Sequence, residues 1–390
     1  MQLSDPRHPL ATLFAAAAAL AAPAVKAEIA TETSVDYRYT EYDESPLPSS
    51  LVLQGSAQRY KVDAHQVEIR TPLDETTEVS VRATHEAMSG SSPWFVLRDR
   101  EGELRQVMSG ATIEDTRREL IATMRREDGP SDAWTATVSL SDEDDYRSTA
   151  FGLGRERPVT EQIALSYGAS FSRDIVEPTD AEEQGRVLRD EKHTVSAVAS
   201  ATFVLDKHST LQAGVQTTFG RGYLDDPYKL AFVGNTLTQD ARPDNRTQVA
   251  WIARWRRAFD DASLHLDYRY AHDSWSVRAH TLDVAWYRQF GKSWWLVPAL
   301  RYHSQSEARF YAPVHEAAAL AAHHSSDYRL GTYGAWSARL SLRKTFGAHA
   351  FVVGFERYDS DEDWAIGGAD QPVPALLEFE RLFVGFDFTF

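Results

Sequence analysis

Cysteine is absent from all 390 residues, so the chain can form neither disulfides nor thiolate metal sites. Beyond residue 20 the sequence also lacks any apolar run long enough for a membrane-spanning helix, which excludes a helical membrane protein. Positively charged residues are outnumbered: the chain has 41 lysines and arginines and 57 aspartates and glutamates, which gives a formal net charge of -16. This excess of acid argues against a nucleic-acid partner.

Aromatic residues are abundant, with 10 Trp, 16 Tyr and 18 Phe. They occur in a chain whose mean hydropathy is -0.42 and in which 25% of the residues are charged. Low mean hydropathy combined with many aromatics fits a transmembrane β-barrel, in which half of each strand faces a watery lumen and rings gather at both membrane interfaces. The chain is also longer than one soluble β-sandwich usually requires.

The last nine residues alternate between apolar and polar side chains, as a strand with one apolar face does. Phe386, Phe388 and Phe390 share the apolar face, whereas Asp387 and Thr389 lie on the polar one. Outer-membrane barrels of Gram-negative bacteria commonly end on such a strand, because the barrel assembly machinery recognises its terminal aromatic residue. We therefore expect these phenylalanines to be an assembly signal. The alternative for this segment alone is an edge strand of a soluble sandwich.

The other end of the chain predicts export. Arg7 and His8 precede an alanine-rich apolar run over residues 10–20, and the small residues around Ala27 suit signal peptidase. This pattern indicates a secretory signal peptide over residues 1–27, with cleavage near Ala27 and a mature domain over residues 28–390. We expect the mature chain in the outer membrane of a Gram-negative bacterium.

Sixteen segments of about ten residues show the alternation of a membrane strand. They are residues 31–42, 58–71, 77–88, 116–126, 133–141, 146–155, 162–173, 193–205, 209–220, 247–258, 262–272, 276–290, 293–304, 328–346, 348–359 and 377–390. An even number is what a single-chain bacterial barrel needs when both termini lie in the periplasm.

The connections between these segments alternate in length along most of the chain. Tight turns follow Leu73, Asp128, Asp206, Asp260 and Gly291, and Gly347 forms another. Long connections lie between them, at residues 89–115, 174–192, 221–246, 305–327 and 360–375. Outer-membrane barrels have short periplasmic turns and long extracellular loops, whereas a soluble sandwich gives no reason for this sorting. The sequence thus predicts an all-β, single-domain, transmembrane antiparallel up-and-down β-barrel of about 16 strands.

The side-chain alternation also predicts which residues line the lumen. In residues 249–256, Trp251 and Trp255 alternate with Arg254 and Arg256. An arginine on the lipid face near mid-bilayer costs about 2 to 4 kcal/mol, so the arginines must point inward. The same reasoning along other strands predicts a lumen-lining charge ladder of Arg254, Arg256, Arg269, Arg301, Arg339, Arg343, Asp267, Glu356 and Asp387. Two interpretations stay open: a polar pore that favours anionic solutes, or a salt-bridged wall that passes little.

Two Met-Ser-Gly triplets, Met88-Ser89-Gly90 and Met108-Ser109-Gly110, flank a long loop. Together with residues 222–229 and 242–246, they resemble the bacterial family known as domain of unknown function 3570. The resemblance covers nearly all of the mature chain and implies an outer-membrane barrel of unassigned activity. Such proteins are often encoded beside a small lipoprotein and a flavin transferase, so the resemblance implies a small lipoprotein partner and hints at surface redox work. No residue pattern here shows a redox centre, and we expect no cofactor.

Enzymatic and metal sites are weakly supported. His85 and Ser89 could mark a hydrolase at the outer rim, but four residues of strand separate them by about 13 Å, too far for proton transfer unless the strand ends between them. His315, His323 and His324 share one long loop without regular ligand spacing, so they are weak metal candidates. We expect no metal, and an enzyme is the less favoured interpretation.

The sequence therefore predicts an outer-membrane channel or surface-assembly component with a charged lumen. Its expected contacts are outer-membrane lipid, lipopolysaccharide and the barrel assembly machinery. The alternatives are a rim-active hydrolase and a structural partner of a surface lipoprotein or redox complex.

Overall fold

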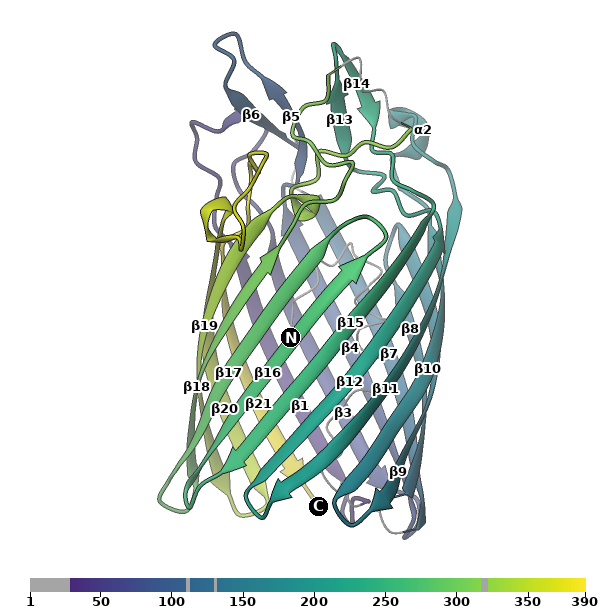
Figure 1. Ribbon diagram of the computed structural model, residues 1–390, viewed down its shortest axis with the longest axis vertical. Coiled ribbons are helices and arrows are strands. Elements are labelled where there is room, and N and C mark those ends of the chain that lie inside the picture. The colour runs from purple at the N-terminus through teal and green to yellow at the C-terminus, as the bar shows by residue number, and fades with distance from the viewer. Residues whose placement is uncertain (1–28, 110–112, 130–131, 317–321) are drawn as a thin grey trace.

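The computed structural model describes residues 29–109, 113–129, 132–316 and 322–390, and 16 of its strands close into one antiparallel barrel. Each barrel strand pairs with its neighbours along the chain, and β1 closes the ring against β21, with Ser34 opposite Thr389 (Figure 1). The barrel strands are β1 (Ser34–Glu44), β3 (Lys61–Pro72), β4 (Thr77–Gly90), β7 (Ile113–Gly129), β8 (Asp132–Asp142), β9 (Tyr146–Thr160), β10 (Ile163–Val176), β11 (Asp190–Asp206), β12 (Ser209–Gly222), β15 (Asn245–Ala258), β16 (Ala262–Asp273), β17 (Arg278–Phe290), β18 (Trp294–Gln305), β19 (Tyr333–Phe346), β20 (His349–Asp361) and β21 (Phe379–Thr389). The predicted fold class is confirmed.

The predicted segments differ from these strands mainly at their ends. The segment predicted to begin at Tyr328 begins at Tyr333, because Tyr328–Leu330 forms a single 3-10 turn, η2. The Asp327 side chain caps this turn by accepting a hydrogen bond from the backbone N–H of Arg329. The predicted signal peptide and its cleavage position near Ala27 lie outside the described residues.

Exposure alternates along the barrel strands and separates an apolar outer face from a polar inner one. Phe355 and Leu382 lie opposite each other and are 45% and 41% exposed, whereas the next pair, Glu356 and Arg381, are 6% and 5% exposed. Aromatic and aliphatic residues on the outer face can meet lipid, and every strand is paired on both sides. The chain is therefore a transmembrane barrel of the outer-membrane type.

Tight turns and both ends of the described chain lie at one end of the barrel. Gly291 and Gly347 have φ values of 58° and 63°, a left-handed conformation that glycine adopts without strain. The backbone N–H of Phe390 donates to the carbonyl of Thr33, which ties the C-terminus to the start of the described chain. We assign this end to the periplasm.

Eight connections lie at the other end, and we number them in chain order. Loops 1 to 8 are residues 45–60, 91–112, 143–145, 177–189, 223–244, 274–277, 306–332 and 362–378. They hold strands that the alternation does not predict: a sheet of β2 (Val52–Gln54), β6 (Leu104–Met108) and β5 (Pro93–Arg98), and a hairpin of β13 (Leu230–Val233) and β14 (Thr236–Gln239). The short helix α2 (Ala181–Gln184) and the 3-10 turn η3 (Glu362–Trp364) complete them.

The hairpin of β5 and β6 stands above the barrel rim, so the described part of loop 2 lies over the surface and outside the lumen (Figure 1). None of the helices among the described residues is long and apolar enough to cross a membrane. Small apolar cores hold the loops to the rim; one of them packs Trp275, Phe310, Leu330 and Val373 together. The loops thus form a packed layer above the barrel.

Candidate functional site in the lumen and mouth

Most of the predicted charge ladder is ion-paired. Arg256 donates to Asp267, Arg343 Nη2 lies 2.9 Å from Asp387 Oδ2, and Arg301 Nε lies 2.6 Å from an oxygen of Asp283. Glu356 accepts from Arg381 and from Ser337, and Asp387 also pairs with Arg38. At these positions the ladder is salt-bridged, because carboxylates on adjacent strands meet the arginines.

Three arginines of the ladder have other surroundings. Arg254 Nη1 donates to Gln212 Oε1 at 3.1 Å, and Arg269 Nη2 donates to Gln248 Oε1 at 3.2 Å. Arg339 lies opposite Glu356 in the strand register, but no ion pair joins them. Among the described residues, no carboxylate lies within ion-pair distance of Arg269 or Arg339. The wall formed by β15 to β19 is therefore the more basic part of the lumen.

The opposite wall is neutral and its side chains are small. On β8 to β12 the inward positions alternate with lipid-facing residues such as Phe151, Phe171 and Val195. We call this surface the hydroxyl wall; it consists of Thr135, Thr137, Ser139, Ser141, Ser148, Ser166, Ser170, Ser172, Thr194, Ser196, Ser200, Thr202, Thr210, Gln212, Gln216 and Thr218. Short side chains leave room beside this wall, whereas long charged ones crowd the other.

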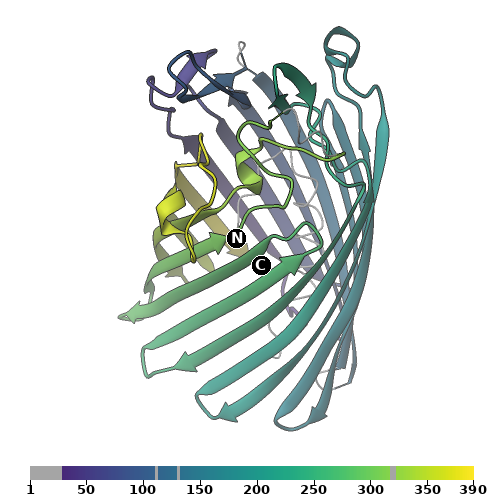
Figure 2. The ribbon, with the colours of Figure 1, turned by 45° about the horizontal axis from the view of Figure 1, so that its top comes forward.

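Loop 5 crosses the mouth of the barrel (Figures 1 and 2). It connects β12 to β15, yet Lys229 Nζ reaches Ser92 Oγ of loop 2 at 3.2 Å, although strands β8 to β11 separate the two loops around the rim. The hydroxyl of Tyr228 donates to Asp145 of loop 3. In the other direction, two backbone hydrogen bonds of 3.0 and 2.7 Å join Ala241 to His324 of loop 7.

A buried ion network fastens loop 5 to loop 7. We call it the clasp; it consists of Asp226, Asp240, Arg242, Asp327 and Arg329. Arg242 Nε lies 2.5 Å from Asp240 Oδ2, and Arg242 Nη2 lies 2.8 Å from Asp327 Oδ2. Arg329 Nε donates to both Asp327 oxygens at 2.8 Å, and its Nη2 also donates to Asp226. These side chains have little or no access to solvent.

Burial and the two guanidinium groups determine the pKa values of the carboxyl groups in the clasp. Burial raises the pKa of all three carboxyl groups, but at Asp226 and Asp327 the nearby Arg329 and Arg242 outweigh it. The pKa of each therefore lies below its usual range. At Asp240 burial outweighs Arg242, and the pKa rises to about 6.

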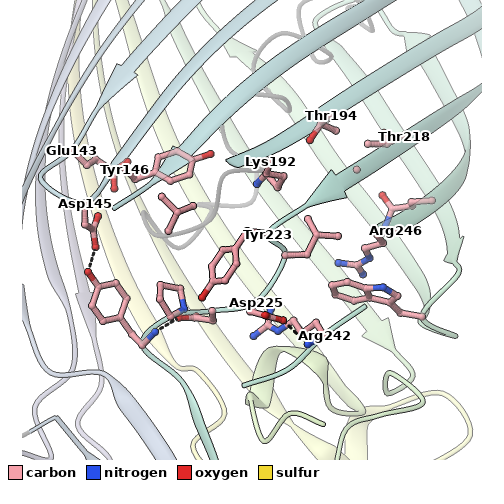
Figure 3. A pocket seen from close by; sticks show the side chains of 18 residues that line it. Glu143, Asp145, Tyr146, Lys192, Thr194, Thr218, Tyr223, Asp225, Arg242 and Arg246 are labelled. Carbon is pink, nitrogen blue, oxygen red and sulfur yellow. Dashed lines mark hydrogen bonds between the residues drawn. The ribbon is translucent and has the colours of Figure 1, made fainter. Parts of the chain in front are cut away.

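A cavity lies beneath loop 5, at the extracellular end of the hydroxyl wall (Figure 3). It holds about 1070 Å³ of empty space, part of it open to solvent. Thr194 and Thr218 of the hydroxyl wall line it, together with the aromatic rings of Tyr146, Tyr223 and Trp275. We call it the mouth pocket.

The charges around the mouth pocket are largely neutralised by neighbours. Lys192 Nζ lies 3.3 Å from Asp174 Oδ2, and both side chains are buried. Arg246 pairs with Asp273, while its guanidinium carbon lies 4.3 Å from the centre of the Trp275 ring. The pocket therefore combines aromatic faces and hydroxyls with basic side chains whose charges already have carboxylate partners, while Asp225 accepts a hydrogen bond from the backbone N–H of Arg242.

Three carboxylates gather beside the mouth pocket. Asp115, Glu143 and Asp145 place one oxygen each within 4.8 Å of one another, as a divalent cation site would require. Burial raises the pKa of Glu143 to about 9, although Arg117, whose Nε lies 3.5 Å away, opposes the shift. A protonated Glu143 beside a guanidinium is a poor ligand, so the cluster alone does not define a metal site.

The histidines named as weak metal candidates have hydrogen-bond partners of their own. His315 Nε2 lies 3.2 Å from the Ser325 carbonyl, and His324 Nε2 lies 3.0 Å from both Thr238 Oγ1 and the Gln239 carbonyl. Within the described residues, neither these two nor the half-exposed His323 belongs to a group of three metal-ligating atoms. They join loops 5 and 7.

The geometry gives no support to the proposed rim hydrolase pair. His85 and Ser89 both lie on β4, which runs unbroken to Gly90. The strand therefore does not end between them, and their separation stays at about 13 Å for four residues of extended chain.

Residues of the two Met-Ser-Gly triplets hold the ends of loop 2 against the barrel rim. Met88 packs beside Tyr42, and Met108 is buried against Leu47. Gly90 has a φ of 134°, and a Cβ there would lie 2.2 Å from the Arg59 carbonyl, so only glycine fits. Ser109 exchanges hydrogen bonds with Ser92, whereas Gly110 lies outside the described residues. Phe386 and Phe388 lie on the outer face of β21, and Phe390, directly after the end of that strand, is 72% exposed.

A family model described as "Protein of unknown function (DUF3570)" matches residues 10–390. No curated protein matches the chain. Among solved structures, the chain is similar to a "Bacterial polysaccharide outer membrane secretin" at 10% identity, covering 92% of this chain and 98% of that one with a TM-score of 0.48. It is also similar to OccAB1 of Acinetobacter baumannii at 9% identity, covering 94% of this chain and 99% of that one with a TM-score of 0.44.

Proposed function

We propose that this chain, which belongs to the family described as "Protein of unknown function (DUF3570)", is a gated outer-membrane channel. Loop 5 closes its extracellular mouth, and the clasp holds loop 5 against loop 7. The passage runs along the hydroxyl wall, where inward side chains are short. Opening requires the clasp to separate, which lets loop 5 swing away from the mouth.

The crossing of the mouth by loop 5 is the observation that carries this proposal. A loop that only decorated the rim would stay near its own strands, β12 and β15. Loop 5 instead contacts loops 2, 3 and 7, through Lys229, Tyr228 and Arg242. These three contacts are hydrogen bonds and an ion pair, which suits a closure that can be reversed.

The basic wall supports a modest preference for anions once the mouth is open. Arg269 and Arg339 add positive charge without a paired carboxylate, and such charge raises the local concentration of anions. Ion pairs elsewhere, such as Arg301 with Asp283, add no net charge. The preference should weaken with salt, because the Debye length is only about 8 Å at 0.15 M.

Shortening loop 5 tests the proposal. Replacing residues 224–243 with a short Gly-Ser linker removes the crossing segment and should raise conductance in planar bilayers about tenfold or more. A tenfold change needs only about 1.4 kcal/mol in the closed-to-open equilibrium. The matched control shortens the tip of the β5–β6 hairpin at residues 99–103, which is remote from the clasp, and should leave conductance unchanged.

Folding of both variants is checked by the shift in gel mobility that a closed barrel shows on heating in detergent. A loop-5 variant that folds but remains as silent as the unmodified protein would refute the channel. The role as a surface-assembly partner would then be the better interpretation.

A further inference from the structure

Several hydroxyls of the hydroxyl wall have no partner among the described residues. The side-chain oxygens of Ser139, Ser170 and Thr202 are shielded from solvent and make no hydrogen bond, and the residues are 1%, 5% and 8% exposed. Buried polar groups in folded proteins are nearly always hydrogen-bonded. Each hydroxyl can donate one hydrogen bond and accept others, and Thr194 and Thr218 carry such groups where they line the mouth pocket.

The hydroxyl wall also lacks net charge. Over residues 164–174 of β10, 192–204 of β11 and 210–222 of β12, the inward side chains include only two charged ones, Asp174 and Lys192. These two pair with each other. An ion moving along this wall would lose hydration without gaining a counter-charge, and an apolar solute would leave the hydroxyls unsatisfied.

The mouth pocket adds aromatic surfaces at the outer end of this wall. Tyr146, Tyr223 and Trp275 line the pocket, and Lys192 Nζ lies 5.9 Å from the centre of the Tyr146 ring (Figure 3). Aromatic rings offer flat apolar faces, and the Trp275 indole N–H already donates to the Asn245 carbonyl at 2.9 Å. Pockets of this kind, apolar with a few convergent polar groups, bind small organic ligands.

We propose that the mouth pocket and the hydroxyl wall bind neutral oligosaccharides. The C–H faces of sugar rings would pack on Tyr223, and the sugar hydroxyls would exchange hydrogen bonds with Thr194 and Thr218. Both surfaces of a sugar are thereby matched, and no charge is left without a partner. This proposal rests on the proposed channel for the passage of the sugar, but binding itself does not require the channel to open.

Titration calorimetry on the folded barrel in detergent tests the proposal. The probes are neutral oligosaccharides of glucose, galactose, mannose and N-acetylglucosamine, with a uronic-acid oligosaccharide and spermidine as charged comparisons. At least one neutral oligosaccharide should bind more tightly than both charged probes. Thr194→Val should weaken that binding about threefold to tenfold, as expected for one lost hydrogen bond.

Thr217→Val is the matched control, because Thr217 lies on β12 with its side chain on the lipid-facing side, and it should bind like the unmodified protein. Tyr223→Ala should weaken binding further, while Tyr223→Phe should retain it. The proposal is overturned if no neutral oligosaccharide binds, or if Thr194→Val and Thr217→Val behave alike. Because calorimetry reads binding alone, these outcomes are independent of whether shortening loop 5 raises conductance.

Discussion

Asp327→Asn should convert a nearly silent barrel into a conducting one. The Asp327 carboxylate accepts hydrogen bonds from Arg242 and Arg329, and its side chain has no exposed surface. Removing its charge leaves two buried guanidinium groups with too little negative charge, and breaking such a buried pair costs about 3 to 5 kcal/mol. That cost falls on the closed mouth alone, since an open clasp would be hydrated. The equilibrium between the closed and open states should therefore shift toward the open state.

Two measurements report this change. Planar-bilayer recordings should show larger and more frequent open steps, and trypsin should cut loop 5 faster after Lys229. The matched control is Asp43→Asn, because Asp43 pairs with Lys61 where both side chains are about half exposed, and such pairs contribute about 0 to 1 kcal/mol. Equal conductance and equal cleavage in the two variants would show that the clasp does not hold the mouth.

Acid should close the channel. The pKa of Asp240 is raised to about 6 in the closed mouth, whereas the same carboxyl in water titrates near 3.8. The closed form therefore binds this proton more tightly than an open form in which Asp240 is hydrated. Lowering the pH through about 6 stabilises the closed form relative to the open form, and raising the pH removes that stabilisation. The free-energy difference between the two forms changes by at most about 3 kcal/mol.

The other clasp carboxyls do not oppose this effect near pH 6. The pKa values of Asp226 and Asp327 lie below 3.8 in the closed form, so both stay charged until the medium is strongly acidic. Glu143, with a pKa of about 9, stays mostly protonated over the same range. Conductance recorded between about pH 5 and pH 8 should rise with pH.

Asp240→Asn should reduce the pH dependence of conductance over that range, leaving the opposing contributions of Asp225, whose pKa burial raises, and His315, whose pKa burial lowers. The control is Asp244→Asn, an exposed residue of the same loop, which should keep the full pH dependence. If Asp240→Asn responds to pH as the unmodified protein does, another group controls the mouth.

The barrel itself could be predicted from the sequence because lipid enforces a period of two. Residues such as Trp251 and Arg254 cannot exchange faces without placing charge in hydrocarbon, so the alternation is explicit in the chain. The ion-pair partners of the inward charged residues are harder to predict from the sequence. Arg301 pairs with Asp283 because the register of β17 and β18 sets them opposite, and a single strand carries no information on that register.

The clasp and the mouth pocket could not be predicted from alternation, because they consist largely of loop residues brought together from distant positions. Asp226 and Arg329 are 103 residues apart along the chain. One signal was available: the segments 222–229 and 242–246, which carry the family resemblance, contain Asp226, Lys229 and Arg242. The hydroxyl wall is also present in the sequence, as serines and threonines at the inward positions of β8 to β12.

A reversible disulfide between loops 5 and 7 tests the central claim most directly. Ala241 and His324 form a hydrogen-bonded antiparallel pair, for which the Cα atoms lie about 5.5 Å apart, within the range that a disulfide spans. Because the chain has no other cysteine, an Ala241→Cys, His324→Cys variant can form only this bond within one molecule. The measurement is the conductance of this variant, with Asp327→Asn added to open the clasp, at about pH 8 before and after reduction. The account predicts a silent oxidised barrel that begins to conduct on reduction; an oxidised barrel that conducts as well as the reduced one would contradict it.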